Sequence, residues 1–175
     1  MNRGVKKILD ATCGSRSIWF DKHHPSAVYM DKRVEHHEAT FGTAHGHRTI
    51  DVNPDVVADF TDMPFPDNTF TLVVFDPPHL KKDTNGWLIK KYGKLDDNWR
   101  EMIRDGFREC MRVLKPDGVL IFKWSETMIP AEELWKAIGQ KPLFGHHSGK
   151  ASKTFWGCFM KELDLPLFQW NEEKQ

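Results

Sequence analysis

The chain has 175 residues, of which 39% are hydrophobic and 29% charged, as is typical of one soluble domain with a sizeable core. Its formal net charge is zero, from 25 basic and 25 acidic residues. This balance excludes a strongly basic nucleic-acid-binding protein, so a polyanionic partner would have to meet a local basic patch. No apolar run reaches the ~20 residues that span a bilayer. The three cysteines show no CxxC spacing, which favours reduced thiols in a cytoplasmic protein.

Short apolar strands alternate with helical stretches along the chain, which predicts an α/β fold with a mainly parallel sheet. The first four expected strands are residues 5–9, 27–30, 56–58 and 71–75. Each is followed directly by an acid, and these acids are Asp10, Asp31, Asp59 and Asp76. Because ligands bind beyond the carboxyl ends of the strands in open α/β sheets, the four acids are expected to line one rim.

The segment after the first expected strand, from Asp10 to Ser17, is expected to turn and to open a helix. Gly14 would let the backbone approach a ligand closely there. Asp31 follows the second expected strand, where a carboxylate can accept hydrogen bonds from both hydroxyls of a ribose. The alternative for Asp31 is a solvated loop acid.

The second half of the chain predicts two helices and three more strands. Apolar residues recur at three- and four-residue spacing from Trp99 to Leu114, as in an amphipathic helix, and residues 115–118 end it. Residues 119–122 form the fifth expected strand and residues 130–138 a second helix, closed by Gly139. Two strands are expected within residues 142–162. No linker divides the chain, so residues 1–175 are expected to form one domain without a separate target-recognition domain.

Four segments resemble the motifs of class I S-adenosylmethionine-dependent methyltransferases, in the same order and spacing. They read ILDATCG, YMD, ADFTDMPFPDNTF and RVLKPDGVL. The resemblance implies a Rossmann-like domain with a seven-stranded, mainly parallel sheet, an antiparallel last strand and helices on both faces. It also implies S-adenosylmethionine as the cofactor.

The same resemblance assigns cofactor-binding residues by their position in the motifs. The first turn would hold the methionine part, Asp31 the ribose, and Asp59 and Phe60 the adenine. Arg16 stands where the family usually has another glycine, so its side chain would either turn outward or crowd the cofactor carboxylate. The full cofactor-binding set implied is Asp10, Ala11, Gly14, Asp31, Asp59, Phe60 and Asp76.

The segment Asp76-Pro77-Pro78-His79 resembles the (D/N/S)PP(Y/F/W/H) signature of methyltransferases that modify a nitrogen conjugated to a ring or carbonyl. The lone pair of such a nitrogen is delocalised, so an acceptor that fixes its N–H bonds favours attack on the sulfonium methyl group. Asp76 and the Pro77 carbonyl would supply acceptors, and His79 would stack on the target ring. The two prolines would fix the backbone direction. The alternative is a strand that simply stops at two prolines.

A lysine-rich segment with aromatic residues follows this motif, a combination that suits a nucleic-acid strand. The expected substrate-binding residues are Lys81, Lys82, Trp87, Lys90, Lys91, Tyr92 and Trp124. The alternatives are a solvated surface loop and, for Trp124, a place in the core.

The densest group of histidines comprises His36, His37, His45 and His47. It is expected on a helix and loop after the second strand. It has no cysteine partners and no HExxH-like spacing, so no metal site is predicted.

The predicted function is transfer of a methyl group from S-adenosylmethionine to an exocyclic amino nitrogen of a nucleobase, with DNA adenine N6 or cytosine N4 favoured. The overall pattern resembles small methyltransferases of bacteriophages and prophages. An RNA base is the first alternative, because an unpaired base requires less extrusion. A non-catalytic cofactor-binding subunit of a complex is the second. Because no separate target-recognition domain is expected, specificity would have to come from loops, a short recognition site, a homodimer or a partner subunit.

Overall fold

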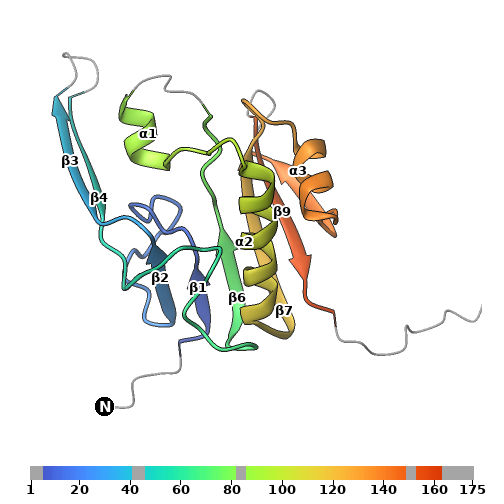
Figure 1. Ribbon diagram of the computed structural model, residues 1–175. Helices are drawn as coiled ribbons and strands as arrows, with labels where there is room; N and C mark the ends of the chain where they lie inside the picture. Colours follow the sequence, from blue (N-terminus) through green and yellow to red (C-terminus); the bar gives the residue numbers. More distant parts are fainter. Residues whose placement is uncertain (1–5, 41–45, 82–85, 149–152, 163–175) are drawn as a thin grey trace, which may run out of the picture.

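The computed structural model describes residues 6–40, 46–81, 86–148 and 153–162. At its centre is a seven-stranded sheet with the order β5-β2-β1-β6-β7-β9-β8 (Figure 1). Strands β5 to β7 in this order are parallel, and β9 is antiparallel to both β7 and β8. The predicted fold class is therefore confirmed. The strands are β1 (Ile8–Asp10), β2 (Ala27–Asp31), β5 (Val56–Val57), β6 (Phe70–Phe75), β7 (Leu114–Ser125), β8 (Phe144–His147) and β9 (Thr154–Met160).

Three helices accompany the sheet. They are α1 (Gly86–Tyr92), α2 (Trp99–Val113) and α3 (Ala131–Ile138). The predicted amphipathic helix is α2, and α3 ends as expected at Gly139, which takes the left-handed conformation with φ 75°. Helix α1 lies within the segment that the sequence predicts to be a polar substrate loop. No helix in the described part of the chain is long and apolar enough to cross a membrane.

The main core lies between the sheet and helices α2 and α3. Alternate strand residues point to this side, because side chains of a strand alternate between its two faces. Leu9, Val73, Leu120 and Phe159 lie next to one another across four strands and are fully buried. They pack with buried residues of α2 such as Ile103. Each such side chain stabilises the fold by roughly 1.5–3 kcal/mol.

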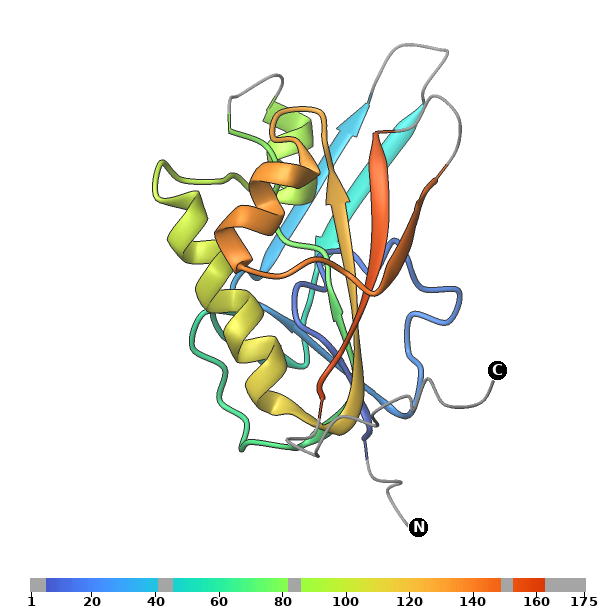
Figure 2. The same ribbon diagram turned by 90° about the vertical axis from the view of Figure 1, so that its right-hand side faces the viewer.

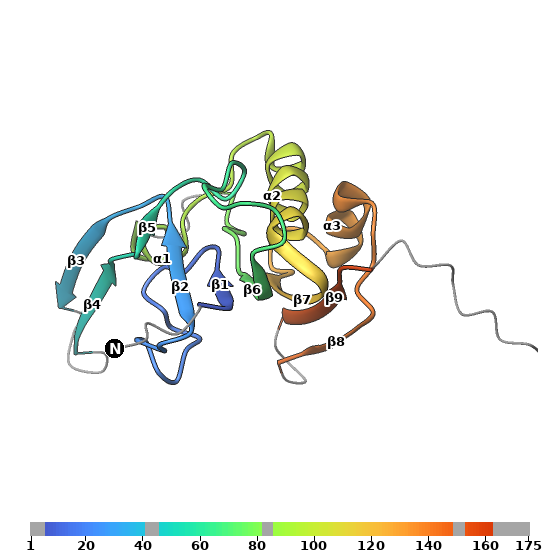
Figure 3. The ribbon, with the colours of Figure 1, turned by 90° about the horizontal axis from the view of Figure 1, so that it is seen from below.

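The expected helices on both faces of the sheet are not found among the described residues. Helices α2 and α3 lie on one face, whereas the segment between β1 and β2 lies on the other as an irregular coil (Figures 2 and 3). Positive φ angles at Gly14 (48°) and Arg16 (55°) interrupt any helix at the start of this segment. The prediction that the turn after β1 opens a helix is therefore wrong.

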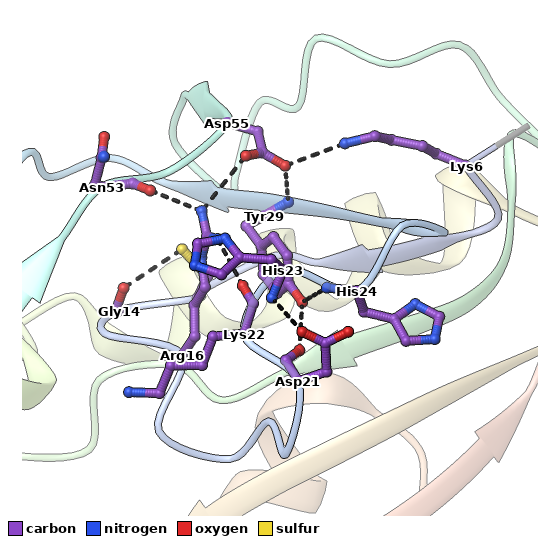
Figure 4. A network of polar contacts seen from close by, with 11 residues as sticks. Lys6, Gly14, Arg16, Asp21, Lys22, His23, His24, Tyr29, Asn53 and Asp55 are labelled. Atoms are coloured by element: carbon purple, nitrogen blue, oxygen red, sulfur yellow. Dashed lines mark hydrogen bonds and ion pairs between the residues drawn. The ribbon is translucent and has the colours of Figure 1, made fainter. Parts of the chain in front are cut away.

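Arg16 anchors this coil to the sheet (Figure 4). Its guanidinium donates to the carbonyl oxygens of Lys22 (2.7 Å) and Asn53 (2.8 Å) and lies 3.9 Å from the centre of the Tyr29 ring. Of the two orientations considered for this side chain, the structure shows the outward one. Arg16 thus ties the coil after β1 to Tyr29 on β2 and to Asn53, which precedes β5.

A β-hairpin takes the place of the helix expected after β2. Strands β3 (Glu35–Thr40) and β4 (His47–Val52) pair antiparallel, with His36 opposite Asp51. Ile50 and Val52 alternate with polar residues and are 2% and 1% exposed, a strand pattern that competes successfully with helix formation. Among the described residues, no group of three or more His, Cys, Asp or Glu side chains is placed to hold a metal ion. His45 lies outside these residues.

Candidate functional site

A cavity opens at the carboxyl ends of β1 and β6, where the strand order reverses direction. From β1 the chain continues to β2 on one side, whereas β6 is followed by β7 on the other. Such a switch point is where ligands bind in open α/β sheets. The empty volume is about 730 Å³, including space open to solvent. The cavity is lined by the coil after β1, residues 31–33 after β2, Phe60, residues 76–79 after β6, and residues 91–94 at the end of α1.

Asp10 is the last residue of β1, directly before the coil that lines the cavity. It is 1% exposed and accepts hydrogen bonds from Trp19 Nε1 (2.6 Å) and the backbone N–H of Thr12 (3.2 Å). Burial, reinforced by the nearby charges of Asp76 and Asp31, raises the pKa of Asp10 to about 7. The turn after β1 is therefore built on a carboxyl group that changes its charge near neutral pH.

Asp31 holds the turn around Gly14 in place. Its carboxylate accepts hydrogen bonds from the backbone N–H of Gly14 (3.0 Å) and from the backbone N–H (3.0 Å) and Nε (3.1 Å) of Arg33. Arg33 also donates from Nη1 to the carbonyl oxygen of Lys90 on α1 (3.0 Å). A ribose at Asp31 would have to share this carboxylate with Arg33. Sequence reasoning missed Arg33, and the only available signal was a cation two residues after a strand-ending acid.

Of the two residues assigned to adenine, only Phe60 lines the cavity. Its ring is 4% exposed and contacts Phe75 edge-on, with the centroids 5.2 Å apart. Gly106 on α2 leaves room for this ring, because a Cβ atom there would lie 2.5 Å from it.

Asp59 does not line the cavity. It accepts hydrogen bonds from the backbone N–H (3.0 Å) and hydroxyl (2.8 Å) of Thr61 and lies 3.6 Å from the Lys32 ammonium. Burial raises the pKa of Asp59, but these bonds and the lysine outweigh burial, so the net shift is downward. Asp59 is thus engaged in its own turn.

Asp76 joins three strand ends at the cavity. Its backbone N–H donates to the Thr12 hydroxyl (2.8 Å), which ties the segment after β6 to the coil after β1. Its carboxylate Oδ2 accepts a hydrogen bond from Lys123 Nζ on β7 (2.5 Å). The side chain of Asp76 is 15% exposed and that of Lys123 is 16% exposed. Lys123 was not among the site residues predicted from the sequence. Pairing of β6 with β7 is what brings the two residues together.

His79 is half-buried and lines the cavity. Its Nδ1 atom is buried and has no hydrogen-bond partner among the described residues. The centre of its ring is 5.4 Å from that of Tyr92 and 6.3 Å from that of Trp124. Burial lowers the pKa of His79, and the opposing charge of Asp76 does not offset this. The imidazole is therefore neutral at pH 7.

Six of the seven predicted substrate-binding residues fall into three groups. Lys91 and Tyr92 line the cavity, with the Lys91 ammonium 4.9 Å from the Tyr92 ring centre. Lys81, Trp87 and Lys90 lie outside the cavity lining, with Lys81 and Lys90 exposed. Lys82 is outside the described residues.

Trp124 requires a correction. It is fully buried and donates from Nε1 to the carbonyl oxygen of Ile129 (2.9 Å), so it packs behind His79 rather than facing a ligand. Its place in the core, considered as an alternative, is the one that the structure shows.

Comparison with solved structures identifies the fold. A SAM-dependent methyltransferase from Leishmania major aligns with a TM-score of 0.50 at 14% identity, covering 90% of this chain and 65% of that chain. This chain has a methyltransferase-like fold. The cyclase SpnF aligns with a TM-score of 0.44 at 17% identity, covering 83% of this chain and 54% of that chain. No protein-family model matches the sequence, and a search of curated proteins finds no match.

Proposed function

We propose that this protein transfers a methyl group from S-adenosylmethionine to an exocyclic amino nitrogen of a nucleobase. One observation carries the proposal. The acid of the Asp76-Pro77-Pro78-His79 segment lies in the switch-point cavity, across from the open turn at Gly14. In a methyltransferase-like fold, this position supports the proposal that Asp76 accepts a hydrogen bond from the target amine beside the cofactor.

The residues at the cavity fit this cofactor. Asp31 is an acceptor for ribose hydroxyls, Phe60 offers an apolar surface for adenine, and the coil after β1 would hold the methionine part. Asp59 is left out of this assignment, because its carboxylate serves its own turn. When bound, the cofactor supplies a methyl group on a positively charged sulfur.

Asp76 and Lys123 would act on the target amine. Lys123 holds one carboxylate oxygen of Asp76, and the other, Oδ1, has no partner within the described residues. Oδ1 can accept a hydrogen bond from the N–H of the amine and direct its lone pair toward the methyl group. When the amine takes up the methyl group, its nitrogen would release one proton to Asp76 or to solvent. His79 lines the same cavity and is the residue proposed to stack on the target ring.

The lysines around the cavity favour a nucleic-acid substrate. Lys91 and Lys94 line it, and Lys81 and Lys90 are exposed nearby in sequence. Phosphates are the natural partners of such a group. DNA is the first choice and RNA the alternative, and product analysis of both nucleic acids distinguishes them.

A second candidate function is a non-catalytic subunit of a complex. Two ion pairs favour it, because they already engage the carboxylates assigned to the cofactor and to the target amine. These pairs are Arg33–Asp31 and Lys123–Asp76. Binding of the cofactor separates the two candidates. A ligand at about 100 times its dissociation constant raises the free energy of unfolding by roughly 2.7 kcal/mol, which a thermal shift detects.

The decisive experiment uses expression in a bacterium that lacks its own base methylases. Mass spectrometry of digested DNA and RNA is expected to show a methylated adenine or cytosine in DNA with the natural chain. Asp76→Ala is expected to abolish this product and to retain cofactor binding, because Asp76 acts on the amine. Asp62→Ala, which removes an exposed acid, is the matched control. Normal product formation by Asp76→Ala would refute the assignment, and a product only in RNA would favour the alternative substrate.

A further inference from the structure

Lys123, the ion-pair partner of Asp76, has an aromatic neighbour on the next strand. Strand β7 lies between β6 and β9 in the sheet (Figure 1). Phe122 and Trp124 belong to the main core, so Lys123 between them points to the opposite face of the sheet, because the side chains of a strand alternate between its faces. Trp156 on β9 stands directly opposite Lys123 in the antiparallel register and therefore shares this face.

The ammonium group of Lys123 contacts both a carboxylate and an aromatic ring. Its Nζ atom lies 2.5 Å from Asp76 Oδ2 and 5.8 Å from the centre of the Trp156 ring. The side chain of Lys123 is largely buried, so water compensates only part of its charge. A cation at this distance is attracted by the face of a tryptophan ring, and more strongly when it is desolvated. The ring therefore stabilises Lys123 in the position from which it binds Asp76.

The Trp156 ring is itself held in place. Its Nε1 atom donates to Ser148 Oγ (3.1 Å), and the backbone N–H of Ser148 donates to the carbonyl oxygen of Thr154 on β9 (2.8 Å). Trp156 is half-buried and does not line the cavity. Its link to the site therefore runs through Lys123 rather than through a bound ligand.

We propose that Trp156 is a positioning residue for Asp76 and acts through Lys123. The inference rests on the proposed function, in which Asp76 Oδ1 accepts a hydrogen bond from the target amine. A carboxylate that is held at one oxygen keeps the other in a fixed direction, and reactions of this kind depend on such orientation. Trp156 is far from Asp76 in the sequence, and the two residues are connected only because β7 pairs with both β6 and β9.

Methyl transfer by purified variants tests this role in the site. Trp156→Leu is expected to lower kcat by about 3- to 30-fold, the range of a partly desolvated contact between a cation and a ring. The KM for S-adenosylmethionine is expected to stay unchanged, because Trp156 does not line the cavity. Trp156→Phe keeps an aromatic ring, so its kcat is expected to stay within about twofold of that of the natural chain.

A double-mutant cycle in urea unfolding tests the same link without methyl transfer. The effects of Trp156→Leu and Asp76→Asn on the folding equilibrium constant are expected to deviate from additivity by at least about threefold. In a Lys123→Met background they are expected to be additive, because the group that links them is absent. Trp135→Leu is the matched control. Its ring packs against Phe155 on the side of α3, so its effect is expected to add to that of Asp76→Asn.

Three results would overturn the inference. Additive effects of Trp156→Leu and Asp76→Asn would show that the ring does not act on Asp76. Non-additivity that persists in the Lys123→Met background would show that it acts by another route. An unchanged kcat in Trp156→Leu would make the contact purely structural. A natural chain without methyl transfer would instead refute the proposed function, and the unfolding cycle would still decide whether Trp156 positions Asp76.

Discussion

Arg33 occupies the carboxylate of Asp31 in the proposed cofactor site, and the sequence analysis did not predict this contact. A ribose at Asp31 must compete with the Arg33 guanidinium, whereas the backbone N–H of Gly14 remains bound to the same carboxylate. The pair is largely buried, with the side chains 18% and 7% exposed. In the proposed cofactor site, the affinity is therefore expected to depend on a residue that no motif identified.

Arg33→Ala is expected to strengthen S-adenosylmethionine binding measured by calorimetry, because the charged competitor is removed. Asp31→Ala is expected to weaken binding and to lower the free energy of unfolding by about 3 kcal/mol, because Arg33 is left largely buried without its partner. Lys141→Ala removes an exposed cation that does not line the cavity and serves as the control. Equal losses of affinity in Arg33→Ala and Asp31→Ala would instead make Arg33 part of the cofactor site.

Asp10 makes the stability of the fold depend on pH. Its pKa is raised from 3.8 to about 7, so between these values the folded state holds a proton that the unfolded state has lost. This contribution to the free energy of unfolding is complete below pH 3.8 and is lost as the pH rises through 7.

Asp10→Asn is therefore expected to remove a decline in stability between about pH 4 and 7, seen in urea unfolding at several pH values. Asp62→Asn, which changes an exposed acid, is expected to keep the decline. An unchanged pH profile in Asp10→Asn would show that Asp10 is ionised throughout this range.

At the scale of elements, the end of helix α1 forms one side of the cavity. Gly93, which follows α1 directly, lies in the cavity lining. Gly93 has φ 75°, and an added Cβ atom would lie 3.1 Å from Pro78 Cγ. Its backbone N–H caps α1 by donating to the carbonyl oxygen of Ile89 (2.8 Å). The end of α1 is thus fixed against the proposed catalytic segment.

Gly93→Ala is expected to destabilise the fold by about 1–2 kcal/mol in urea unfolding, since a side chain at positive φ is strained. It is also expected to weaken cofactor binding by displacing α1. Gly86→Ala, at the start of the same helix, meets no atom within 4 Å and is expected to be neutral. If Gly93→Ala behaved like Gly86→Ala, α1 would not shape the cavity.

At the scale of the whole molecule, zero net charge coexists with lysines gathered around and near one cavity. Replacing four of them by glutamine is expected to weaken DNA binding and to flatten its dependence on salt. The slope is expected to fall by about 0.9 for each phosphate that the variant no longer neutralises. The four are Lys81, Lys90, Lys91 and Lys94.

Binding of labelled DNA over a series of salt concentrations measures this slope. Replacing the exposed residues Lys6, Lys136 and Lys141 is the control, because none of them lines the cavity. An equal change of slope in the two variants would show binding by overall charge rather than by this site.

The sequence by itself determined the strands of the seven-stranded sheet, the acids at the ends of four of them and the amphipathic helix α2. Each of these features depends on a few consecutive residues, so hydrophobic periodicity and turn chemistry are enough to predict it. The Gly14 turn and the Asp76-Pro77-Pro78-His79 segment could likewise be placed at one rim, because parallel strands have their carboxyl ends on the same side.

Only the tertiary structure decided which partners these residues have. Lys123 reaches Asp76, and Trp124 enters the core, because β7 pairs with β6 in one particular register. The β3–β4 hairpin replaces a helix because burial of Ile50 and Val52 outweighs local preference. Contacts between residues far apart in the chain depend on strand order and packing, and no local pattern encodes them.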